Sequence, residues 1–303
     1  MPPELPSYNV FVSGLSNSIM REGYVKGIEN STQGHVENIS LGASNCGMGL
    51  WMLRIFEAQI RAADVVLLDY FIMDYQTDPG YITRDLPLLL RGISRFSRPV
   101  VLLWPDKLNM QTPVRDKISV YADVCAAEGC LLIDCRELAR DVMARHGLSN
   151  LDELFQDAAH IHPRFAYEMG IDIARRIESH LSYVDRQGYV HVQIVAPENG
   201  PIVGPPWLKI PVTSLPDFLP EVDGELIGMM ILTKSADFEI RVDGRSRRVW
   251  TYWAPDDPNP PQILRYISID SVPVRKGQPV RVETWSKDEL VDGMMVHSVV
   301  IRL

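Results

Sequence analysis

The segment Asp64-Val65-Val66-Leu67-Leu68-Asp69-Tyr70 is a nearly continuous run of apolar residues. A strand with one face in water alternates apolar and polar residues, whereas a continuous run is typical of a parallel strand that helices cover on both faces. Four similar runs lie on either side of this segment: Tyr8–Val12, Val36–Leu41, Pro99–Trp104 and Cys130–Asp134. Together the five runs predict the strands of one buried sheet.

Helical patterns follow or separate these runs. The predicted helices are Gly49–Ala62, Thr83–Phe96, Pro113–Ala127, Arg136–Arg145 and Phe165–Tyr183. Strands that alternate with helices of about 10 to 15 residues predict right-handed crossovers and a parallel sheet with helices on both faces. Such sheets bind ligands beyond the carboxyl ends of their strands.

The composition changes after about residue 185. Two segments rich in Pro, Gly and Asp, Pro197–Pro206 and Pro255–Pro261, interrupt a series of strand-like runs. These runs are Tyr189–Val195, Leu208–Val212, Leu226–Thr233, Phe238–Val242, Val249–Trp253, Ile263–Ile269, Pro279–Trp285 and Met294–Ile301. Short strands at regular spacing without a helical pattern predict an all-β sandwich. We therefore predict an α/β domain over residues 1–184 and a β-sandwich over residues 185–303.

The overall charge and hydropathy exclude several classes of protein. The 303 residues carry a formal net charge of −9, which argues against a nucleic-acid partner because no basic block is present to neutralise phosphates. No stretch approaches the roughly 18 apolar residues of a membrane span. Residues 1–6 contain neither a basic n-region nor an apolar h-region, so we expect no secretory signal.

Four cysteines, Cys46, Cys125, Cys130 and Cys135, lack the spacing of metal ligands. We interpret them as buried thiols and expect a reducing, cytoplasmic location. No cofactor is predicted.

The segments Asp157-Ala-Ala-His160 and Gly14-Leu15-Ser16 favour nucleophilic catalysis. An Asp three residues before a His can bind one ring nitrogen, which leaves the other free to accept a proton. A Ser directly after an apolar strand that ends in Gly is a natural proton donor to that His. Ser16, Gly42 and Asp74 follow the first three predicted strands, so all three are expected on one edge of the sheet.

These blocks, in this order, resemble the SGNH/GDSL hydrolases over about residues 8–183. The resemblance implies a flavodoxin-like α/β fold with Ser16 as nucleophile, His160 as general base and acid, and Asp157 as the group that orients His160. It also implies oxyanion donors from the backbone N–H groups of Ser16 and Gly42.

The third block departs from the family, which has Gly-x-Asn-Asp where this chain has Phe71-Ile72-Met73-Asp74. The side chain of Met73 has no N–H group to stabilise an oxyanion. Three alternatives are open: the two backbone donors suffice, Asn17 or Asn45 replaces the missing amide, or the domain is a weak or inactive catalyst. Asp74 is expected to support the loop by accepting backbone N–H bonds.

The resemblance implies an esterase that removes a short, acetyl-like acyl group from a carbohydrate. Residues 13–18 look like the first block of SGNH proteins associated with bacterial polysaccharide modification. Transfer of the acyl group to a glycan hydroxyl, by an O-acyltransferase, and glycan binding without catalysis are alternative functions.

Simpler interpretations of the same residues stay open. Ser16 could cap a helix, the Asp157 and His160 loop could cap the last helix, and His160 with His162 and Asp157 could bind a metal. The aromatic cluster Trp250, Tyr252 and Trp253 could be a glycan platform or part of the β-sandwich core.

Overall fold

The computed structural model describes residues 5–42, 44–112, 114–181, 192–195, 202–203, 210–211, 217–233, 237–242, 245–250, 263–285 and 295–302. The chain divides into two compact units, Met1–Val190 and His191–Leu303. The predicted domain boundary after residue 184 falls within residues 182–191, outside the described residues.

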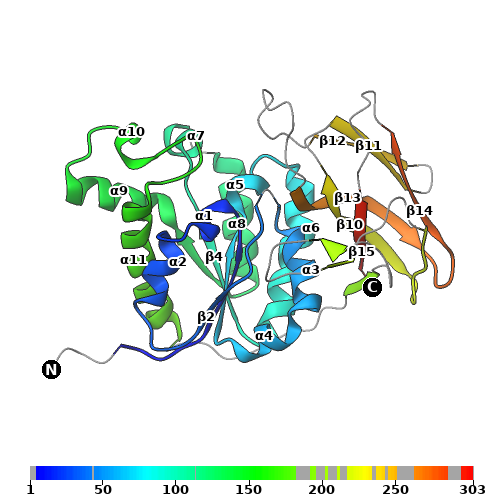
Figure 1. The fold of residues 1–303 in the computed structure, drawn as a ribbon, viewed down its shortest axis with the longest axis horizontal. Coiled ribbons are helices and arrows are strands. Elements are labelled where there is room, and N and C mark those ends of the chain that lie inside the picture. Colours follow the sequence, from blue (N-terminus) through cyan, green and yellow to red (C-terminus); the bar gives the residue numbers. More distant parts are fainter. Residues whose placement is uncertain are drawn as a thin grey trace. The chain divides into compact units, whose positions relative to one another are not determined.

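The first unit is built on a parallel sheet covered by helices (Figure 1). The five strands of this sheet follow the order β2-β1-β3-β4-β5. Its strands are β1 (Val10–Gly14), β2 (Val36–Asn38), β3 (Val65–Asp69), β4 (Arg98–Leu103) and β5 (Leu131–Asp134). Every residue of β1 and β3 is buried, as the continuous apolar run predicted. The chain reverses its direction across the sheet between β1 and β3, and this switch point is where ligands bind in such folds.

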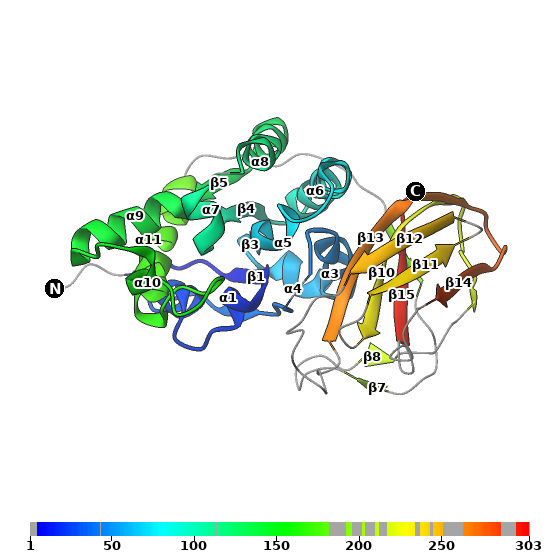
Figure 2. The same ribbon diagram turned by 90° about the horizontal axis from the view of Figure 1, so that it is seen from above.

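Helices cover both faces of this sheet (Figure 2). They are α1 (Ser16–Ile19), α2 (Tyr24–Glu29), α3 (Gly47–Ile55), α4 (Glu57–Ala62), α5 (Phe71–Asp74), α6 (Pro79–Ser94), α7 (Lys107–Gln111), α8 (Arg115–Ala127), α9 (Cys135–His146), α10 (Leu151–Leu154) and α11 (Pro163–Leu181). Helices α2, α9 and α11 lie together on one face, and α3, α6 and α8 on the other (Figure 2). Among the described residues, no helix has both the length and the apolarity needed to cross a membrane.

The predicted helix Gly49–Ala62 is wrong as a single element, because it is divided into α3 and α4 at Phe56. The ring of Phe56 contacts those of Phe11 and Trp51, at centroid distances of 6.1 and 6.3 Å. These contacts with the core coincide with a non-helical backbone at Phe56, where φ is −114° and ψ is 29°. The second predicted strand is also shorter than expected and ends at Asn38.

Helices α2 and α11 approach each other closely at Gly170. A Cβ atom at this position would collide with the backbone carbonyl of Tyr24, so the close approach requires glycine. Helix α11 begins three residues after His160, while α2 follows the segment that contains Ser16. This packing therefore brings the two ends of the α/β unit together.

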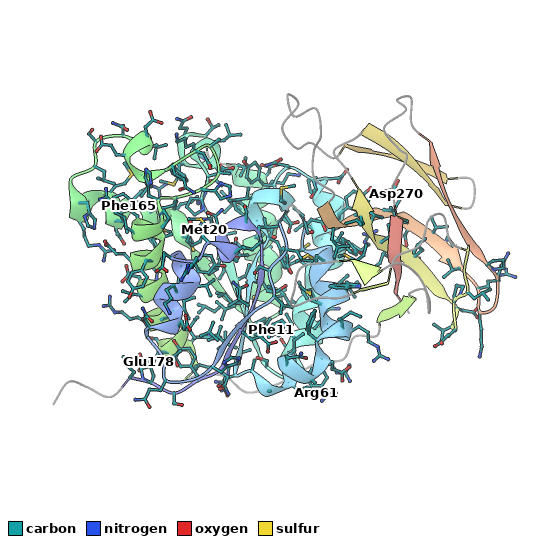
Figure 3. The ribbon with its side chains drawn as sticks, viewed as in Figure 1. Phe11, Met20, Arg61, Phe165, Glu178 and Asp270 are labelled. Carbon is teal, nitrogen blue, oxygen red and sulfur yellow. The ribbon has the colours of Figure 1, made fainter. Side chains whose placement is uncertain are left out.

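Figure 3 locates labelled residues at the two ends of the first unit. Arg61 and Glu178 lie at one end, where the guanidinium of Arg61 stacks 3.5 Å from the ring centroid of Phe96 (Figure 3). Phe11 is buried in the core, and Met20 lies near the other end, just after α1 (Figure 3). The candidate site lies at the end where α1 begins.

The second unit is antiparallel. Its sheets have the strand orders β13-β10-β15-β6, β12-β11-β14-β9 and β7-β8. The strands are β6 (Val192–Val195), β7 (Ile202–Val203), β8 (Ile210–Pro211), β9 (Asp217–Phe218), β10 (Gly224–Thr233), β11 (Asp237–Val242), β12 (Arg245–Trp250), β13 (Ile263–Val274), β14 (Val280–Trp285) and β15 (Met295–Arg302). Leu226, Met229 and Ile231 of the central strand β10 are buried. The predicted aromatic platform falls largely outside the described residues, which include neither Tyr252 nor Trp253.

Candidate active site

Ser16 lies at the turn that follows β1. The strand ends at Gly14, Leu15 is extended, and α1 begins at Ser16. Gly14 pairs with Asp69 of β3, and a Cβ atom at Gly14 would collide with the Ser18 hydroxyl. Glycine therefore allows the chain to turn tightly against β3. The side chain of Ser16 does not cap the helix, because Leu15 occupies the N-cap position.

A chain of hydrogen bonds joins Asp157, His160 and Ser16. Nδ1 of His160 lies 2.9 and 2.8 Å from the two carboxylate oxygens of Asp157, and Nε2 lies 2.7 Å from Oγ of Ser16. The carboxylate accepts a hydrogen bond from the Nδ1–H group, which leaves Nε2 as the acceptor for the hydroxyl of Ser16. The side chain of His160 is 26% exposed, so a substrate can reach it.

The loop that carries His160 is held in a fixed shape. Oδ1 of Asp157 accepts bonds of 2.8 Å from the backbone N–H groups of Ala159 and His160. Phe155 and Ile161 form an antiparallel bridge across the loop. Partial burial opposes ionisation of Asp157, but the hydrogen bonds from Ala159 and His160 hold the pKa of this carboxyl below its usual value. Asp157 is therefore prepared to carry the negative charge that orients His160.

The surroundings of His160 do not favour the metal interpretation. Both of its ring nitrogens have protein partners, and the ring of His162 instead faces the edge of Phe165, with centroids 6.4 Å apart. Within the part of the chain that the structure describes, no three His, Cys, Asp or Glu side chains are grouped to hold a metal ion.

Two of the predicted oxyanion residues, Gly42 and Asn45, lie between β2 and α3. Gly42 is partly exposed, and apart from its chain neighbours no described residue approaches within 4 Å of the position that its Cβ would take. Asn45 is partly exposed, and its Oδ1 accepts a 3.1 Å bond from the N–H of Gly47 at the start of α3. Met73 lies in α5 and is partly exposed. The amide of Asn17, in contrast, is buried and binds the carbonyl of Ala159 at 3.1 Å.

Asp74 connects the loop after β2 to the loop after β3. Its carboxylate is buried and accepts a 2.9 Å bond from the N–H of Cys46 and another from the hydroxyl of Tyr121. Burial raises the pKa of Asp74 to about 7, although these hydrogen bonds oppose the shift. The bond to Cys46 keeps the loop that contains Asn45 close to α5.

A second buried carboxylate, which sequence reasoning missed, lies beneath the Ser16 turn. Oδ2 of Asp69 accepts a 2.9 Å bond from Ser18 and lies 3.3 Å from the hydroxyl of Tyr24. The amide of Asn38 donates a 2.6 Å bond to the carbonyl of Ser18. Burial raises the pKa of Asp69 to about 7 against the effect of the bonds from Ser18 and Tyr24. An ionisable residue at the end of an apolar strand was the available signal.

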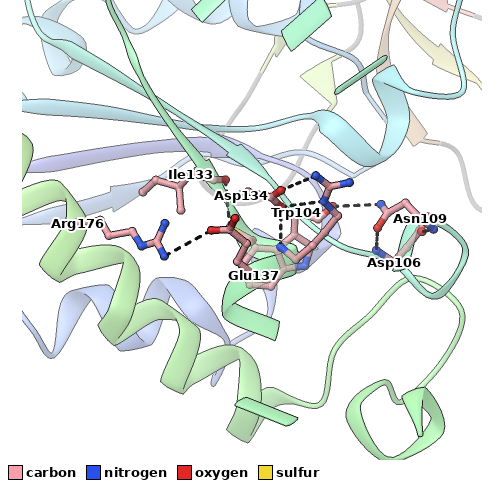
Figure 4. A network of polar contacts seen from close by, with 9 residues as sticks. Trp104, Asp106, Asn109, Ile133, Asp134, Glu137 and Arg176 are labelled. Atoms are coloured by element: carbon pink, nitrogen blue, oxygen red, sulfur yellow. Dashed lines mark hydrogen bonds and ion pairs between the residues drawn. The ribbon is translucent and has the colours of Figure 1, made fainter. Parts of the chain in front are cut away.

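Polar contacts also cluster where β4 and β5 end (Figure 4). Asp106 caps α7 through the N–H of Asn109, and Asp134 accepts bonds from Arg136 (Figure 4). Helix α7 in turn contacts the His160 loop, because the N–H of Lys107 donates a 3.0 Å bond to the carbonyl of Ala158. The end of β4 is thereby linked to the candidate site.

The raised pKa values of Asp69 and Asp74 predict a pH dependence of stability. Each folded-state pKa, about 7, exceeds the ordinary value of 3.8, so the folded protein binds more protons than the unfolded chain between these limits. Their contribution to stability is present below about pH 4 and is lost as the pH rises through 7. The slope approaches about 1.4 kcal/mol per pH unit for each group. The free energy of unfolding of Asp69→Asn, minus that of wild type, should therefore increase as the pH rises from 5 to 8. Urea denaturation at each pH measures this difference.

Asp152→Asn is the control, because this carboxyl is 85% exposed. The difference in free energy of unfolding between Asp152→Asn and wild type should stay constant over this pH range. A constant difference between Asp69→Asn and wild type across this pH range would contradict the assignment.

No protein-family model matches the sequence, and no curated protein sequence matches it either. Solved structures do resemble it. A two-domain esterase active on acetylated mannans, co-crystallised with mannopentaose, superimposes with a TM-score of 0.64 at 12% sequence identity, covering 98% of this chain and 91% of that chain. A second structure of a two-domain esterase active on acetylated mannans gives a TM-score of 0.63 at 12% identity, covering 98% of this chain and 92% of that chain.

A member of the lipolytic protein G-D-S-L family from Veillonella parvula covers 56% of this chain and 98% of its own, at 14% identity and a TM-score of 0.46. The two-domain likeness confirms the predicted fold class. The chain thus has an SGNH-like α/β fold followed by an all-β unit.

Proposed function

We propose that this protein is a serine esterase that removes a short, acetyl-like acyl group from a carbohydrate. The observation that supports the proposal is the unbroken chain of hydrogen bonds from Asp157 through His160 to Ser16. A Ser, a His and a carboxylate in this arrangement generate a nucleophile without a metal or cofactor.

In the proposed reaction, Oγ of Ser16 attacks the acyl carbonyl while Nε2 of His160 takes the hydroxyl proton. The bond between the acyl carbon and the sugar oxygen then breaks, and His160 returns the proton to the leaving sugar hydroxyl. A water molecule, deprotonated by His160, then attacks the acyl-Ser16 ester. The bond between the acyl carbon and Oγ breaks, and His160 returns the proton to Oγ, which releases the carboxylic acid and restores Ser16. Asp157 stabilises the imidazolium in both steps.

The negative oxygen of each tetrahedral intermediate needs hydrogen-bond donors. We assign this role to the backbone N–H groups of Ser16 and Gly42 and to the side-chain amide of Asn45. The bond from Gly47 to Oδ1 of Asn45 fixes the orientation of that amide. Asp74 supports the arrangement by holding the N–H of Cys46, next to Asn45.

The carbohydrate part of the proposal is supported by the fold. Two solved structures whose likeness covers 98% of this chain are of two-domain esterases active on acetylated mannans. Acetylated manno-oligosaccharides are therefore the first substrates to test.

Active-site labelling tests the nucleophile directly. A fluorophosphonate should modify wild-type protein at Ser16, and peptide mass mapping should locate the adduct. Ser16→Ala should lose the label, whereas Ser149→Ala should keep it, because the hydroxyl of Ser149 binds Glu153 at an exposed helix start. An unlabelled wild-type protein, or a label on another residue, would contradict the proposal.

The acceptor of the acyl group is tested by the product. Acetate release from acetylated manno-oligosaccharides is expected for the esterase. Acetyl transfer to an added oligosaccharide, in place of acetate release, would instead identify an O-acyltransferase that uses the same acyl-Ser16 intermediate. Oligosaccharide binding without either product, unchanged in Ser16→Ala, would favour a glycan-binding protein.

A further inference from the structure

Asn17 links the segment that carries Ser16 to the loop that carries His160. Its Nδ2 donates a 3.1 Å bond to the carbonyl of Ala159, across 142 residues of sequence. Each partner is the immediate neighbour of a proposed catalytic residue. The side chain of Asn17 is only 2% exposed, so water competes little for this bond.

Apart from the bond between His160 and Ser16, the hydrogen bonds of the loop within the described residues fix its shape or join it to α7 rather than to the segment that carries Ser16. Asp157 binds the N–H groups of Ala159 and His160, and these bonds stay within the loop. The N–H of Lys107 holds the carbonyl of Ala158, but Lys107 belongs to α7. The amide of Asn17 therefore helps to fix the position of the whole loop relative to Ser16.

The geometry excludes Asn17 from the oxyanion site. Its amide faces the carbonyl of Ala159 and is buried, so it cannot reach an oxygen that develops in the open site. Oδ1 of Asn17 is also buried and has no hydrogen-bond partner among the described residues. Asn17 therefore takes part in hydrogen bonding through its donor Nδ2 and not through its acceptor Oδ1.

We propose that Asn17 is a positioning residue that holds His160 at hydrogen-bonding distance from Ser16, an inference that rests on the proposed function. Proton transfer requires the two atoms to be within about 2.6–3.2 Å, and a misplacement of about 1 Å can reduce turnover about 100-fold. The bond from Asn17 to Ala159 thus supports the bond between His160 and Ser16 and, with it, the geometry of the proton transfer.

Two near-isosteric variants test this role. Asn17→Leu removes the donor, and we expect kcat to fall about 10- to 100-fold while KM stays within about 2-fold. Asn17→Asp cannot donate as a carboxylate but regains a donor when protonated. Its rate of Ser16 labelling by the fluorophosphonate, divided by that of wild type, should therefore rise as the pH falls.

Asn9→Ala is the matched control. Nδ2 of Asn9 also donates to an alanine carbonyl, that of Ala62, at 3.4 Å, but next to the beginning of β1, away from Ser16. Its kcat and labelling rate should stay within about 2-fold of wild type. Equal losses of kcat in Asn17→Leu and Asn9→Ala, or a pH-independent ratio for Asn17→Asp, would overturn the proposal.

A readout that does not depend on activity separates this proposal from the proposed function. The ¹⁵N chemical shift of His160 Nε2 reports the bond to Ser16, so Ser16→Ala should move it. Asn17→Leu should move it in the same direction, and Asn9→Ala should not. If the shift in Asn17→Leu equals that of wild type, the positioning role is wrong. If the shifts behave as expected but wild type is never labelled, the proposed function fails while the positioning role holds.

Discussion

His160→Ala should reduce the turnover of acetylated manno-oligosaccharides by a factor on the order of 10⁴ to 10⁶. Without the imidazole, no group is placed to take the hydroxyl proton of Ser16 or to return it to the leaving sugar, since Nε2 of His160 is the atom 2.7 Å from Oγ. The loss should appear mainly in kcat, because the imidazole acts on the transition state rather than on sugar binding. Acetate release under saturating substrate measures it.

The fold should survive this substitution. The His160 loop is held by backbone bonds, including those from Gln156 to the carbonyl of His160 and from His162 to that of Leu154. The circular dichroism spectrum of His160→Ala should match that of wild type.

His162→Ala is the matched control for the loss of activity. It removes an imidazole two residues away whose ring faces Phe165 instead of Ser16. We expect its kcat to stay within a factor of about ten of wild type. If His160→Ala keeps its activity, or if both variants lose the same amount, His160 is not the general base.

The fold of the first unit could be predicted because its decisive signals are local. A continuous apolar run such as Val65–Asp69 identifies a strand covered on both faces, and such runs determine the order of strands and helices along the chain. The break at Phe56 could not be predicted. It coincides with ring contacts to Phe11, a residue 45 positions earlier, and no glycine or proline marks it in the sequence.

The candidate site shows the same division. The pairing of Asp157 with His160 is a local contact between residues three apart, so their spacing was enough to suggest it. Ser16 could be joined to them because it follows a predicted strand. The bond between Asn17 and Ala159 depends on how two distant loops approach, and neither residue type suggests it. The contact between Asn17 and Ala159 therefore depends on a loop arrangement that exists only in the folded protein.

Met73→Asn should raise kcat for acetate release, and the gain, up to about 100-fold, should be largest where the amide of Asn45 is absent. Loss of one side-chain donor from an oxyanion site typically costs about 10² to 10³ in turnover, and the side chain of Met73 has no N–H group. Position 73 lies in α5, beside Asp74, whose carboxylate holds the N–H of Cys46. An amide at position 73 would therefore enter the site on the side of the loop that contains Asn45. Steady-state kinetics on acetylated manno-oligosaccharides measure the gain.

The comparison with Asn45→Ala shows which amide the wild-type protein uses. If Asn45 replaces the missing amide, Asn45→Ala should lower kcat about 10²-fold, and adding Met73→Asn should restore most of that loss. Met73→Leu is the control for side-chain shape, because it keeps the apolar volume without adding a donor. A lower kcat in Met73→Asn, with Met73→Leu unchanged, would mean that the apolar side chain at position 73 contacts the substrate. Met73 would then be a binding residue, and the oxyanion would depend on the backbone N–H groups of Ser16 and Gly42 together with Asn45.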